Sequence, residues 1–372
     1  MTATATATTP PRHAGTAPPR RAGSRARRIL GSPLVDLLVG PHGIDRYLEL
    51  ISPSMTISDA RAEIVKVERQ TQRSVTLTIK PNRAWAGFKA GQFVRVGVEI
   101  DGVRRTRTYS PASSQHQAQE LLELTISFLP DGLVSSYLRA ENPGGVVHLG
   151  TADGDFGLPD PRPERIVLIS GGSGVTPVLS MLRTLLDEQH PGEITFIHYG
   201  RTRADWLYEG ELKQLASVHP NLQVEYVATR EGGAHFGPET VADPTGAHVA
   251  VCGPTSLIEA VKDVWADAPD RFHSESFSPP SLTVSGDAAE GTLRFTKAGT
   301  TAEIVPGTLL EQAEAAGLSP EHGCRMGICH SCTCRKTAGT VKNILTGEVS
   351  SEEDEDIQIC IHVPAGDVAL EI

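Results

Sequence analysis

The chain has 372 residues with 39% hydrophobic residues, enough for more than one packed core, so we expect two or three globular domains. Its net charge of -11 argues against nucleic-acid binding. No apolar run approaches the roughly 20 residues of a membrane-spanning helix, and the N-terminus lacks the apolar core of a secretion signal. We therefore expect a cytoplasmic protein.

The N-terminal residues 1–28 are rich in Ala, Thr, Pro and Arg and contain six arginines but no acidic residue. This composition predicts a disordered arm, which is either a solvated tail or a peripheral contact with an anionic membrane surface or a partner. Residues 29–57 follow as a short segment, and its apolar part, Leu34–Leu50, predicts a helix that ends before Pro53.

Alternation of apolar and polar residues begins at about Asp59 and continues through short stretches separated by Gly and Pro. This period-2 pattern predicts a small antiparallel β-barrel over residues 58–160. The predicted strands include Ala62–Val67, Val75–Ile79, Phe93–Val98 and Leu122–Phe128.

After Pro161 the strands become largely apolar and alternate with helical segments. This βαβ pattern predicts an α/β domain with a parallel sheet over residues 161–277. The predicted strands are Arg165–Ser170, Ile194–His198, Val224–Val227 and His248–Cys252, and the predicted helices are Pro177–Glu188 and Leu207–Ala216.

A third domain is predicted over residues 278–372, beginning with a linker at Ser278–Ser281 and strands at Leu282–Val284, Leu293–Phe295 and Thr301–Val305. Five of the six cysteines fall here, and such clustering favours a metal site over a disulfide framework. From Thr283 onward this domain has 14 acidic and 6 basic residues, so we expect a partner with a basic docking face.

Four of these cysteines have the spacing C-x4-C-x2-C followed by a distant fourth. Thiolates are the soft ligands of iron–sulfur clusters, and this spacing is that of a plant-type [2Fe-2S] site. A zinc site would show paired C-x2-C knuckles, and a two-cysteine redox pair would leave one thiol unexplained. Cys334 is surplus and is expected to be a buried thiol. The predicted cluster ligands are Cys324, Cys329, Cys332 and Cys360.

Two motifs in the barrel region combine groups suited to a flavin. In Arg107–Ser110 a cation and a hydroxyl are suited to a diphosphate, and the Tyr109 ring is suited to packing on an isoalloxazine. Further along, Gly132–Leu138 begins a helix whose first N–H groups are free to receive phosphate oxygens.

A glycine-rich turn, Gly171–Pro177, joins an apolar strand to a helix. It differs from the G-x-G-x-x-G fingerprint, but glycines at a helix start admit a pyrophosphate for the same physical reason. By itself, an ordinary βα turn is an equally good interpretation. After the next strand, Gly200–Arg203 carries arginines where an acidic residue would favour NADH, so NADPH is predicted, with NADH and solvated surface arginines as alternatives.

Together these motifs resemble the ferredoxin–NADP reductase superfamily, followed from about Leu282 by a segment that resembles a plant-type ferredoxin domain. The ferredoxin resemblance includes Cys360–Val368 and implies a β-grasp fold of the α+β class. The resemblance implies that FAD, with FMN as an alternative, is bound by Arg107, Tyr109, Ser110, Gly132, Val134 and Ser135.

The same resemblance extends to Cys252-Gly253-Pro254 and Glu275-Ser276-Phe277, which match the end of the nucleotide unit. It implies that Cys252 and Glu275 form the environment of the nicotinamide and the reactive flavin edge, and that Phe277 covers the flavin ring. The implied coenzyme-binding residues are Gly171, Gly172, Ser173, Gly174, Thr176, Pro177, Arg201, Arg203, Tyr208, Gly253 and Pro254.

The domain order resembles that of bacterial oxygenase reductases with a C-terminal ferredoxin. The implied function is electron transfer from NADPH through FAD and the cluster to an oxygenase-type acceptor. A finer likeness, through Ile44–Ile51 and Cys324–Cys334, is to reductases of membrane fatty-acyl desaturases or related hydroxylases. A Rieske ring-hydroxylating oxygenase is the alternative acceptor, and an iron–sulfur redox sensor is the alternative of another class. The acidic run Glu352–Asp356 either steers docking of the acceptor or is a solvated loop.

Overall fold

The computed structural model describes residues 54–56, 59–128, 132–244, 246–277, 291–323, 325, 327 and 330–372. Several sequence predictions lie outside these residues: the arm 1–28, all of 29–57 except 54–56, the linker 278–281, the strand Leu282–Val284 and the cysteines Cys324 and Cys329.

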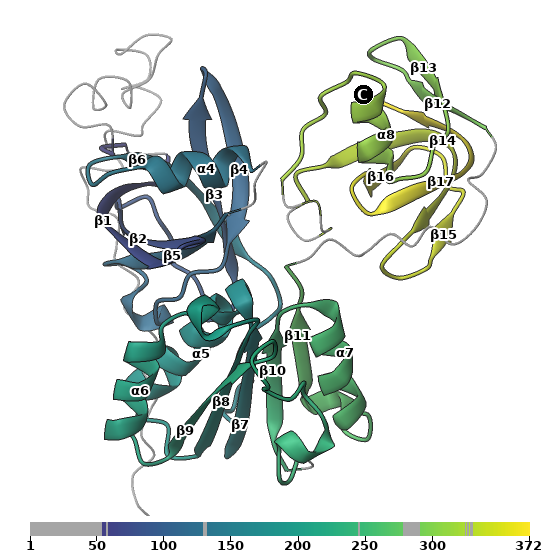
Figure 1. Cartoon of the computed structure of the whole chain (residues 1–372). Helices are drawn as coiled ribbons and strands as arrows, with labels where there is room; N and C mark the ends of the chain where they lie inside the picture. The colour runs from purple at the N-terminus through teal and green to yellow at the C-terminus, as the bar shows by residue number, and fades with distance from the viewer. Residues whose placement is uncertain are drawn as a thin grey trace, which may run out of the picture.

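The first sheet has the strand order β4-β3-β6-β1-β2-β5, and every neighbouring pair is antiparallel (Figure 1). Along β1, buried Ala62 and Ile64 alternate with exposed Glu63 and Val65, so one face points into the core. The antiparallel barrel predicted from this alternation is confirmed. The strands are β1 (Arg61–Thr71), β2 (Ser74–Pro81), β3 (Phe93–Ile100), β4 (Val103–Tyr109), β5 (Leu122–Ser127) and β6 (Val146–Asp153).

The helix α4 (Leu133–Ala140) follows β5 and buries Val134 and Leu138 in the barrel core. Its N-cap is Gly132, which has an extended backbone and no side chain to cap the helix. The first-turn N–H groups of α4 therefore lack an intrahelical partner.

The second sheet is fully parallel, with the order β11-β10-β7-β8-β9. The central strand β7 is buried almost throughout because apolar clusters cover both faces of the sheet. The parallel α/β sheet predicted from the sequence is confirmed. Its elements are β7 (Arg165–Gly171), β8 (Glu193–Gly200), β9 (Leu222–Ala228), β10 (His248–Cys252), β11 (Phe272–Glu275), α5 (Val175–Asp187), α6 (Glu209–Val218) and α7 (Thr255–Val264).

Strand order reverses at β7, because β8 and β9 extend the sheet on one side whereas β10 and β11 extend it on the other. In open parallel sheets, ligands bind outside the carboxyl ends of the strands at such a reversal. The glycine turn after β7 lies at this point. The fold thus places the predicted coenzyme loop where the topology favours a ligand.

The third sheet has the order β13-β12-β17-β14-β15, with β16 paired to β14, and it lies beside the barrel in Figure 1. It is mixed, because β12 and β17 are parallel and the other pairs are antiparallel. Its elements are β12 (Thr292–Phe295), β13 (Thr300–Glu303), α8 (Leu309–Ala315), β14 (Thr333–Asn343), β15 (Val349–Ser350), β16 (Glu355–Gln358) and β17 (His362–Leu370).

A capping box fixes the start of α8: the Glu311 N–H donates to Thr308 Oγ1, and the Thr308 N–H donates to Glu311 Oε2. Short 3₁₀ turns complete the described structure: Gln115–Gln117, Gly172–Gly174, Arg203–Asp205, Pro238–Thr240 and Pro269–Arg271. Among the described residues, every helix is too short or too polar to cross a membrane. The three sheets fall within the predicted domain ranges, whose boundaries stay predictions.

Candidate functional site

The glycine loop between β7 and α5 is open on one side and closely packed on the other. Gly172 has a positive φ of 56°, and a Cβ there would meet no atom within 4 Å. At Gly174 a Cβ would lie 2.2 Å from the carbonyl oxygen of Cys252, so the loop touches the end of β10. A ligand can therefore approach the backbone at Gly172. Thr176 and Pro177 are buried below the loop, and Thr176 Oγ1 donates to the carbonyl of Ser173 over 3.3 Å.

A cavity of about 780 Å³ opens in front of this loop and is lined by both the barrel and the α/β domain. The barrel side includes Ser127 and Phe128, and the opposite side includes Leu207 and Phe277. We call it the interdomain pocket. Eight of the predicted site residues line it: Gly171, Gly172, Ser173, Gly174, Arg201, Gly253, Pro254 and Phe277.

Other lining residues were not singled out by the sequence patterns. Thr229 lies just after β9, at the same carboxyl edge of the sheet as the glycine loop, and this position is a signal that could have identified it. Arg73 comes from the β1–β2 turn, and only the folded contact between two domains brings it to the pocket. Asp205 is the one carboxylate among the described lining residues, and it accepts hydrogen bonds from the backbone and hydroxyl of Thr202.

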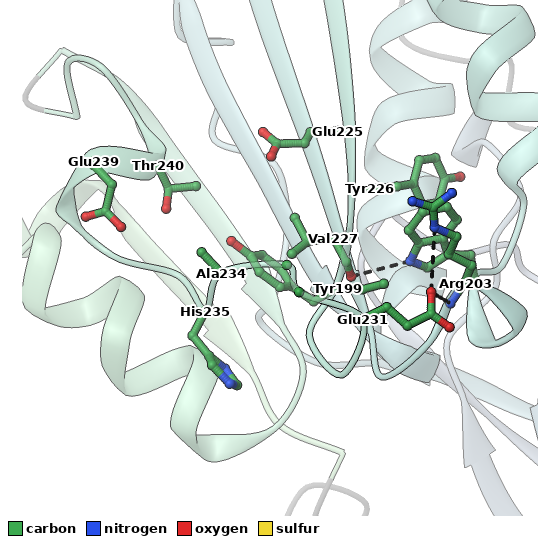
Figure 2. Close-up of a pocket in the computed structure, with 14 residues that line it drawn as sticks. Tyr199, Arg203, Glu225, Tyr226, Val227, Glu231, Ala234, His235, Glu239 and Thr240 are labelled. Carbon is green, nitrogen blue, oxygen red and sulfur yellow. Dashed lines mark hydrogen bonds and ion pairs between the residues drawn. The ribbon is translucent and has the colours of Figure 1, made fainter.

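The two predicted 2′-phosphate arginines lie in different places. Arg201 lines the interdomain pocket, whereas Arg203 lines a second cavity of about 510 Å³. Figure 2 shows the Arg203 guanidinium directed at Glu231, with an Nε–carboxylate distance of 3.5 Å. Glu225 and Glu239 also line this second cavity, so its electrostatic character disfavours a phosphate.

Tyr208 is in neither cavity. Its side chain is buried, and its hydroxyl forms hydrogen bonds with Thr125 and, over 3.4 Å, with Thr76 in the barrel. The hydroxyl of Tyr208, which is one of the predicted coenzyme-binding residues, is therefore engaged by the barrel.

The predicted flavin motif begins on β4 and ends just after it. Burial raises the pKa of Tyr109 to about 12, and the nearby Arg107 partly opposes this rise. Ser110 is buried, and among the described residues its Oγ has no hydrogen-bond partner. An unpartnered buried hydroxyl is destabilising unless a ligand supplies the partner, so the position fits a bound flavin.

The start of α4 adds further donors near this motif, because α4 contacts β4. Val134 and Ser135 are buried in its first turn, and Ser135 Oγ donates to the carbonyl of Gly132 over 3.0 Å. Because its first N–H groups lack an intrahelical partner and it lies at the positive end of the helix dipole, this turn suits a phosphate.

Cys252 and Glu275 supply a buried thiol and a carboxyl at the ends of β10 and β11. Burial raises the pKa of Glu275 to about 8, and its Oε2 has no hydrogen-bond partner among the described residues. Cys252 packs in the same apolar cluster as Ala112, two residues after Ser110, and as Phe277. The sheet end therefore adjoins the chain segment that follows the flavin motif.

Two of the four predicted cluster ligands are described, and both are buried: Cys332 is 2% exposed and Cys360 is 4% exposed. The Ile359 N–H donates to the carbonyl of Cys332 over 3.2 Å, which joins the two ligand segments. Cys334 is half-buried on β14, and burial raises the pKa of its thiol to about 11. Apolar surroundings and low solvent access suit an iron–sulfur cluster.

Charged side chains cluster around His322, in the segment that precedes the predicted cluster ligands. Arg325 forms an ion pair with Glu314 of α8, and its guanidinium lies 3.0 Å from His322 Nε2. Burial lowers the pKa of His322, its hydrogen bond with the carbonyl of Pro320 partly opposes this shift, and the positive charge of Arg325 adds to it.

Comparisons with known proteins agree with this three-part arrangement. Three family profiles match in succession: an oxidoreductase FAD-binding domain at residues 62–157, an oxidoreductase NAD-binding domain at 168–263 and a 2Fe-2S iron-sulfur cluster binding domain at 295–365. An NADPH oxidoreductase of Mycobacterium tuberculosis is 34% identical over 339 residues, covering 88% of each chain.

A glycine betaine monooxygenase reductase subunit of Chromohalobacter salexigens is 31% identical over 76% of this chain and 87% of its own. Among solved structures, phthalate dioxygenase reductase superimposes with a TM-score of 0.60 at 23% identity, covering 84% of this chain and 97% of its own. At that identity the likeness is one of fold.

The chain therefore belongs to the ferredoxin–NADP reductase superfamily, in the branch that carries a C-terminal 2Fe-2S ferredoxin domain. It is an NAD(P)H oxidoreductase of the ferredoxin reductase type, whose cofactors are FAD, a nicotinamide dinucleotide and a [2Fe-2S] cluster.

Proposed function

We propose that this chain is the reductase component of an oxygenase system and delivers single electrons from NADPH to the oxygenase. The observation that supports this most directly is the interdomain pocket, where the glycine loop faces the barrel. Bound FAD supplies the exchange between two-electron and one-electron chemistry. Relatives named as parts of oxygenases include the glycine betaine monooxygenase reductase subunit and methane monooxygenase component C of Methylosinus trichosporium.

Residue roles in this proposal follow from the environment of each side chain. Arg107, Tyr109, Ser110 and the first turn of α4 bind FAD, and Phe277 covers its ring. Cys252 and Glu275 border its reactive edge, and the glycine loop holds the coenzyme pyrophosphate. The proposed cluster ligands are Cys324, Cys329, Cys332 and Cys360.

NADPH is the proposed coenzyme, with NADH as the alternative. Arg201 lines the interdomain pocket and offers a bidentate partner for a 2′-phosphate. Asp205 acts against this preference, but its carboxylate is held by Thr202. Curated relatives include both an NADPH oxidoreductase and an NADH oxidoreductase.

The acidic run is the proposed docking site for a basic face of the acceptor. Lys336 Nζ lies 3.6 Å from Glu355, and Arg335 forms an ion pair with Asp356 at 2.7 Å. The side chains of Glu352, Glu353 and Asp354 are exposed and form no ion pair with the residues that the structure describes. These three carboxylates therefore remain available for steering.

The finer proposal is that the acceptor is a membrane fatty-acyl desaturase or a related hydroxylase, with a Rieske oxygenase as the alternative. The experiment is stopped-flow reduction of the purified protein with NADPH and with NADH, followed by mixing with each candidate acceptor. The proposal is supported if the flavin is bleached first, the cluster is reduced next, and the desaturase then reoxidises the reduced protein. Fast reduction with reoxidation only by the Rieske protein rejects the finer proposal, and failure of both coenzymes rejects the reductase function.

Neutralising the three free carboxylates as Glu352→Gln, Glu353→Gln and Asp354→Asn tests the docking site. Electron transfer to the acceptor should slow at low salt and should converge with the wild type at high salt, because screening removes the steering. Reduction of a small neutral dye is the control and should be unchanged. An unaltered salt dependence of acceptor reduction would reject the docking role.

A further inference from the structure

The helix that begins at the coenzyme loop is fastened along one face to the segment that follows the flavin motif. Residues 180, 183 and 184 of α5 lie on this face because their spacing is three and four residues. Ser180 Oγ donates to the carbonyl of Ser113 over 2.7 Å, and Thr184 Oγ1 accepts from the Gln115 N–H over 3.1 Å. These bonds connect α5, which follows the predicted coenzyme loop, to the segment that follows the predicted flavin motif.

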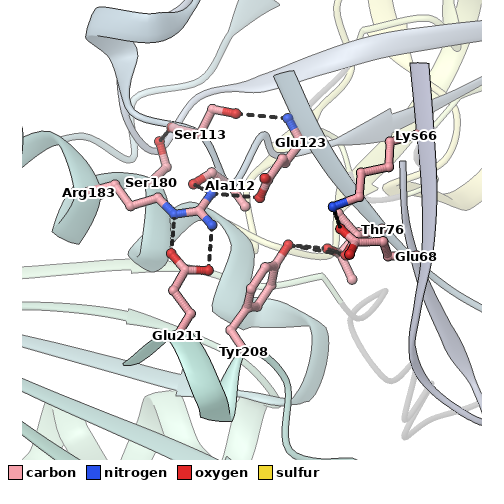
Figure 3. A network of polar contacts seen from close by, with 11 residues as sticks. Lys66, Glu68, Thr76, Ala112, Ser113, Glu123, Ser180, Arg183, Tyr208 and Glu211 are labelled. Atoms are coloured by element: carbon pink, nitrogen blue, oxygen red, sulfur yellow. Dashed lines mark hydrogen bonds and ion pairs between the residues drawn. The ribbon is translucent and has the colours of Figure 1, made fainter. Parts of the chain in front are cut away.

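Arg183 forms the centre of this contact. Its guanidinium makes a bidentate ion pair with Glu211 of α6, at 2.8 and 2.7 Å. It also donates to Glu123 of β5 over 2.8 Å and to the carbonyl of Ala112 over 2.9 Å. Figure 3 shows the guanidinium between the two carboxylates, one from each domain. One side chain thus links two helices of the α/β domain to two segments of the barrel.

Tyr208 completes the contact from the start of α6. Its backbone is left-handed, with φ of 56°, so the chain turns sharply before the helix begins at Glu209. The ring reaches the barrel threonines Thr76 and Thr125, and the Arg183 guanidinium lies 5.5 Å from its centroid. Burial of the ring and the favourable cation–π geometry restrict both residues to one arrangement.

We propose that Arg183 is a positioning residue that sets the nicotinamide relative to the flavin. The inference rests on the proposed function. Gly171–Gly174 lies at the start of α5, and Ser110 lies two residues before Ala112, so Arg183 connects the supports of both reacting rings. A displacement of about 1 Å at reacting atoms can cost roughly 100-fold in rate. Loosening this contact therefore changes the rate of hydride transfer more than it changes coenzyme affinity.

The bond to Glu123 distinguishes positioning from simple stabilisation of one domain. Glu211 and Arg183 both belong to the α/β domain, so their ion pair alone would stabilise that domain without fixing its orientation. Glu123 belongs to strand β5 of the barrel. Its backbone is held in place there, because its N–H donates a hydrogen bond to Ser113 Oγ over 2.8 Å. The Arg183–Glu123 pair is therefore the ion pair through which Arg183 holds the α/β domain to the barrel.

The test uses the holoenzyme with Arg183→Met, which keeps much of the aliphatic stem, and Arg183→Lys. Stopped-flow measurements give the rate of flavin reduction at saturating coenzyme, the coenzyme Kd and the long-wavelength charge-transfer absorbance of the stacked rings. Arg183→Met should reduce the rate by about 10- to 100-fold and weaken the absorbance, with Kd within about two-fold and FAD content unchanged. Arg183→Lys should give an intermediate rate.

The matched control is Arg165→Met, because Arg165 pairs with Glu193 and Asp243 inside the α/β domain, away from the barrel. It should lower thermal stability but leave the flavin reduction rate unchanged. A double-mutant cycle then combines Arg183→Met with Glu123→Gln. Their effects on the reduction rate should be strongly non-additive, because both remove the same interdomain contact.

Additive effects, or an Arg183→Met rate within about two-fold of the wild type, would overturn the positioning role. If Arg183→Met does not fold, Arg183→Lys and Glu123→Gln give the same comparison, and normal rates in both reject the inference. A wild type that neither NADPH nor NADH reduces rejects the proposed function itself, and the inference with it.

Discussion

Cys252 on β10 lies opposite Glu275 on β11 in the parallel sheet, so a thiol and a carboxyl share the sheet edge that carries the glycine loop Gly171–Gly174. Burial raises the pKa of Glu275 to about 8 and the pKa of Cys252 well above its ordinary value, and the nearby Glu275 charge raises that of Cys252 further. Both groups are therefore predominantly neutral at pH 7.

The first prediction concerns the pH dependence of flavin reduction. Above about pH 8 the Glu275 carboxyl ionises, and a fixed negative charge beside the proposed flavin edge opposes the arrival of a hydride. The wild-type rate at saturating coenzyme should therefore fall with an apparent pKa near 8. Glu275→Gln should match the wild type at neutral pH and lose this decline. An equal decline in both proteins would contradict the assignment.

Stability of the FAD-free protein gives an independent check. The unfolded carboxyl ionises near its ordinary pKa of 4.5, whereas the folded one retains its proton up to about pH 8. Unfolding then releases a proton in this interval, so the free energy of unfolding should fall as the pH rises from 4.5 to 8. Urea denaturation should show a shallower fall for Glu275→Gln.

The second prediction separates Arg201 from Arg203. Arg201 lines the interdomain pocket, whereas Arg203 pairs with Glu231 outside it, so of the two arginines Arg201 is the one placed to bind a 2′-phosphate. Arg201→Ala should raise the KM for NADPH by about 10-fold or more and leave the KM for NADH unchanged. Steady-state kinetics with a dye acceptor provide the measurement. Arg203→Ala is the matched control, and a larger NADPH defect there would reverse the assignment.

The third prediction concerns the cluster ligands. Cys332→Ser and Cys360→Ser each remove a buried thiolate, so each should lose the iron–sulfur absorption and the electron paramagnetic resonance signal after reduction. Cys334→Ser should retain both, because Cys334 lies on β14 and is surplus to four ligands. Flavin reduction by the coenzyme should persist in all three variants. Loss of the cluster in Cys334→Ser alone would require a different ligand set.

Features set by local sequence were predictable, and features set by distant partners were not. The glycine loop follows an apolar strand, so its place at the sheet edge follows from pattern and chain order. Tyr208 could not be placed in this way, because its hydroxyl partners Thr76 and Thr125 lie far away in the chain. The strand pattern was also weak in the third sheet, where β16 contains acidic residues that pair with β14.

The conformation of the acidic run Glu352–Asp356 also depends on a partner that is distant in the sequence. Its five carboxylates look equivalent in sequence, yet Lys336 is fully buried and holds part of the run in place. The Lys336 ammonium donates to the carbonyls of Gly339 and Glu352 and lies 3.6 Å from the Glu355 carboxylate. A buried charge is tolerated when such partners surround it, and removal of one partner leaves the others unsatisfied.

Lys336→Met should therefore lower the free energy of unfolding of the third domain by about 2 to 3 kcal/mol. Chemical denaturation followed by the cluster absorbance measures this change, whereas flavin fluorescence reports the barrel and should be unaffected. Lys342→Met, at an exposed position on the same strand, is the matched control and should be nearly neutral. Equal stability of the two variants would mean that the acidic run does not depend on Lys336 for its conformation.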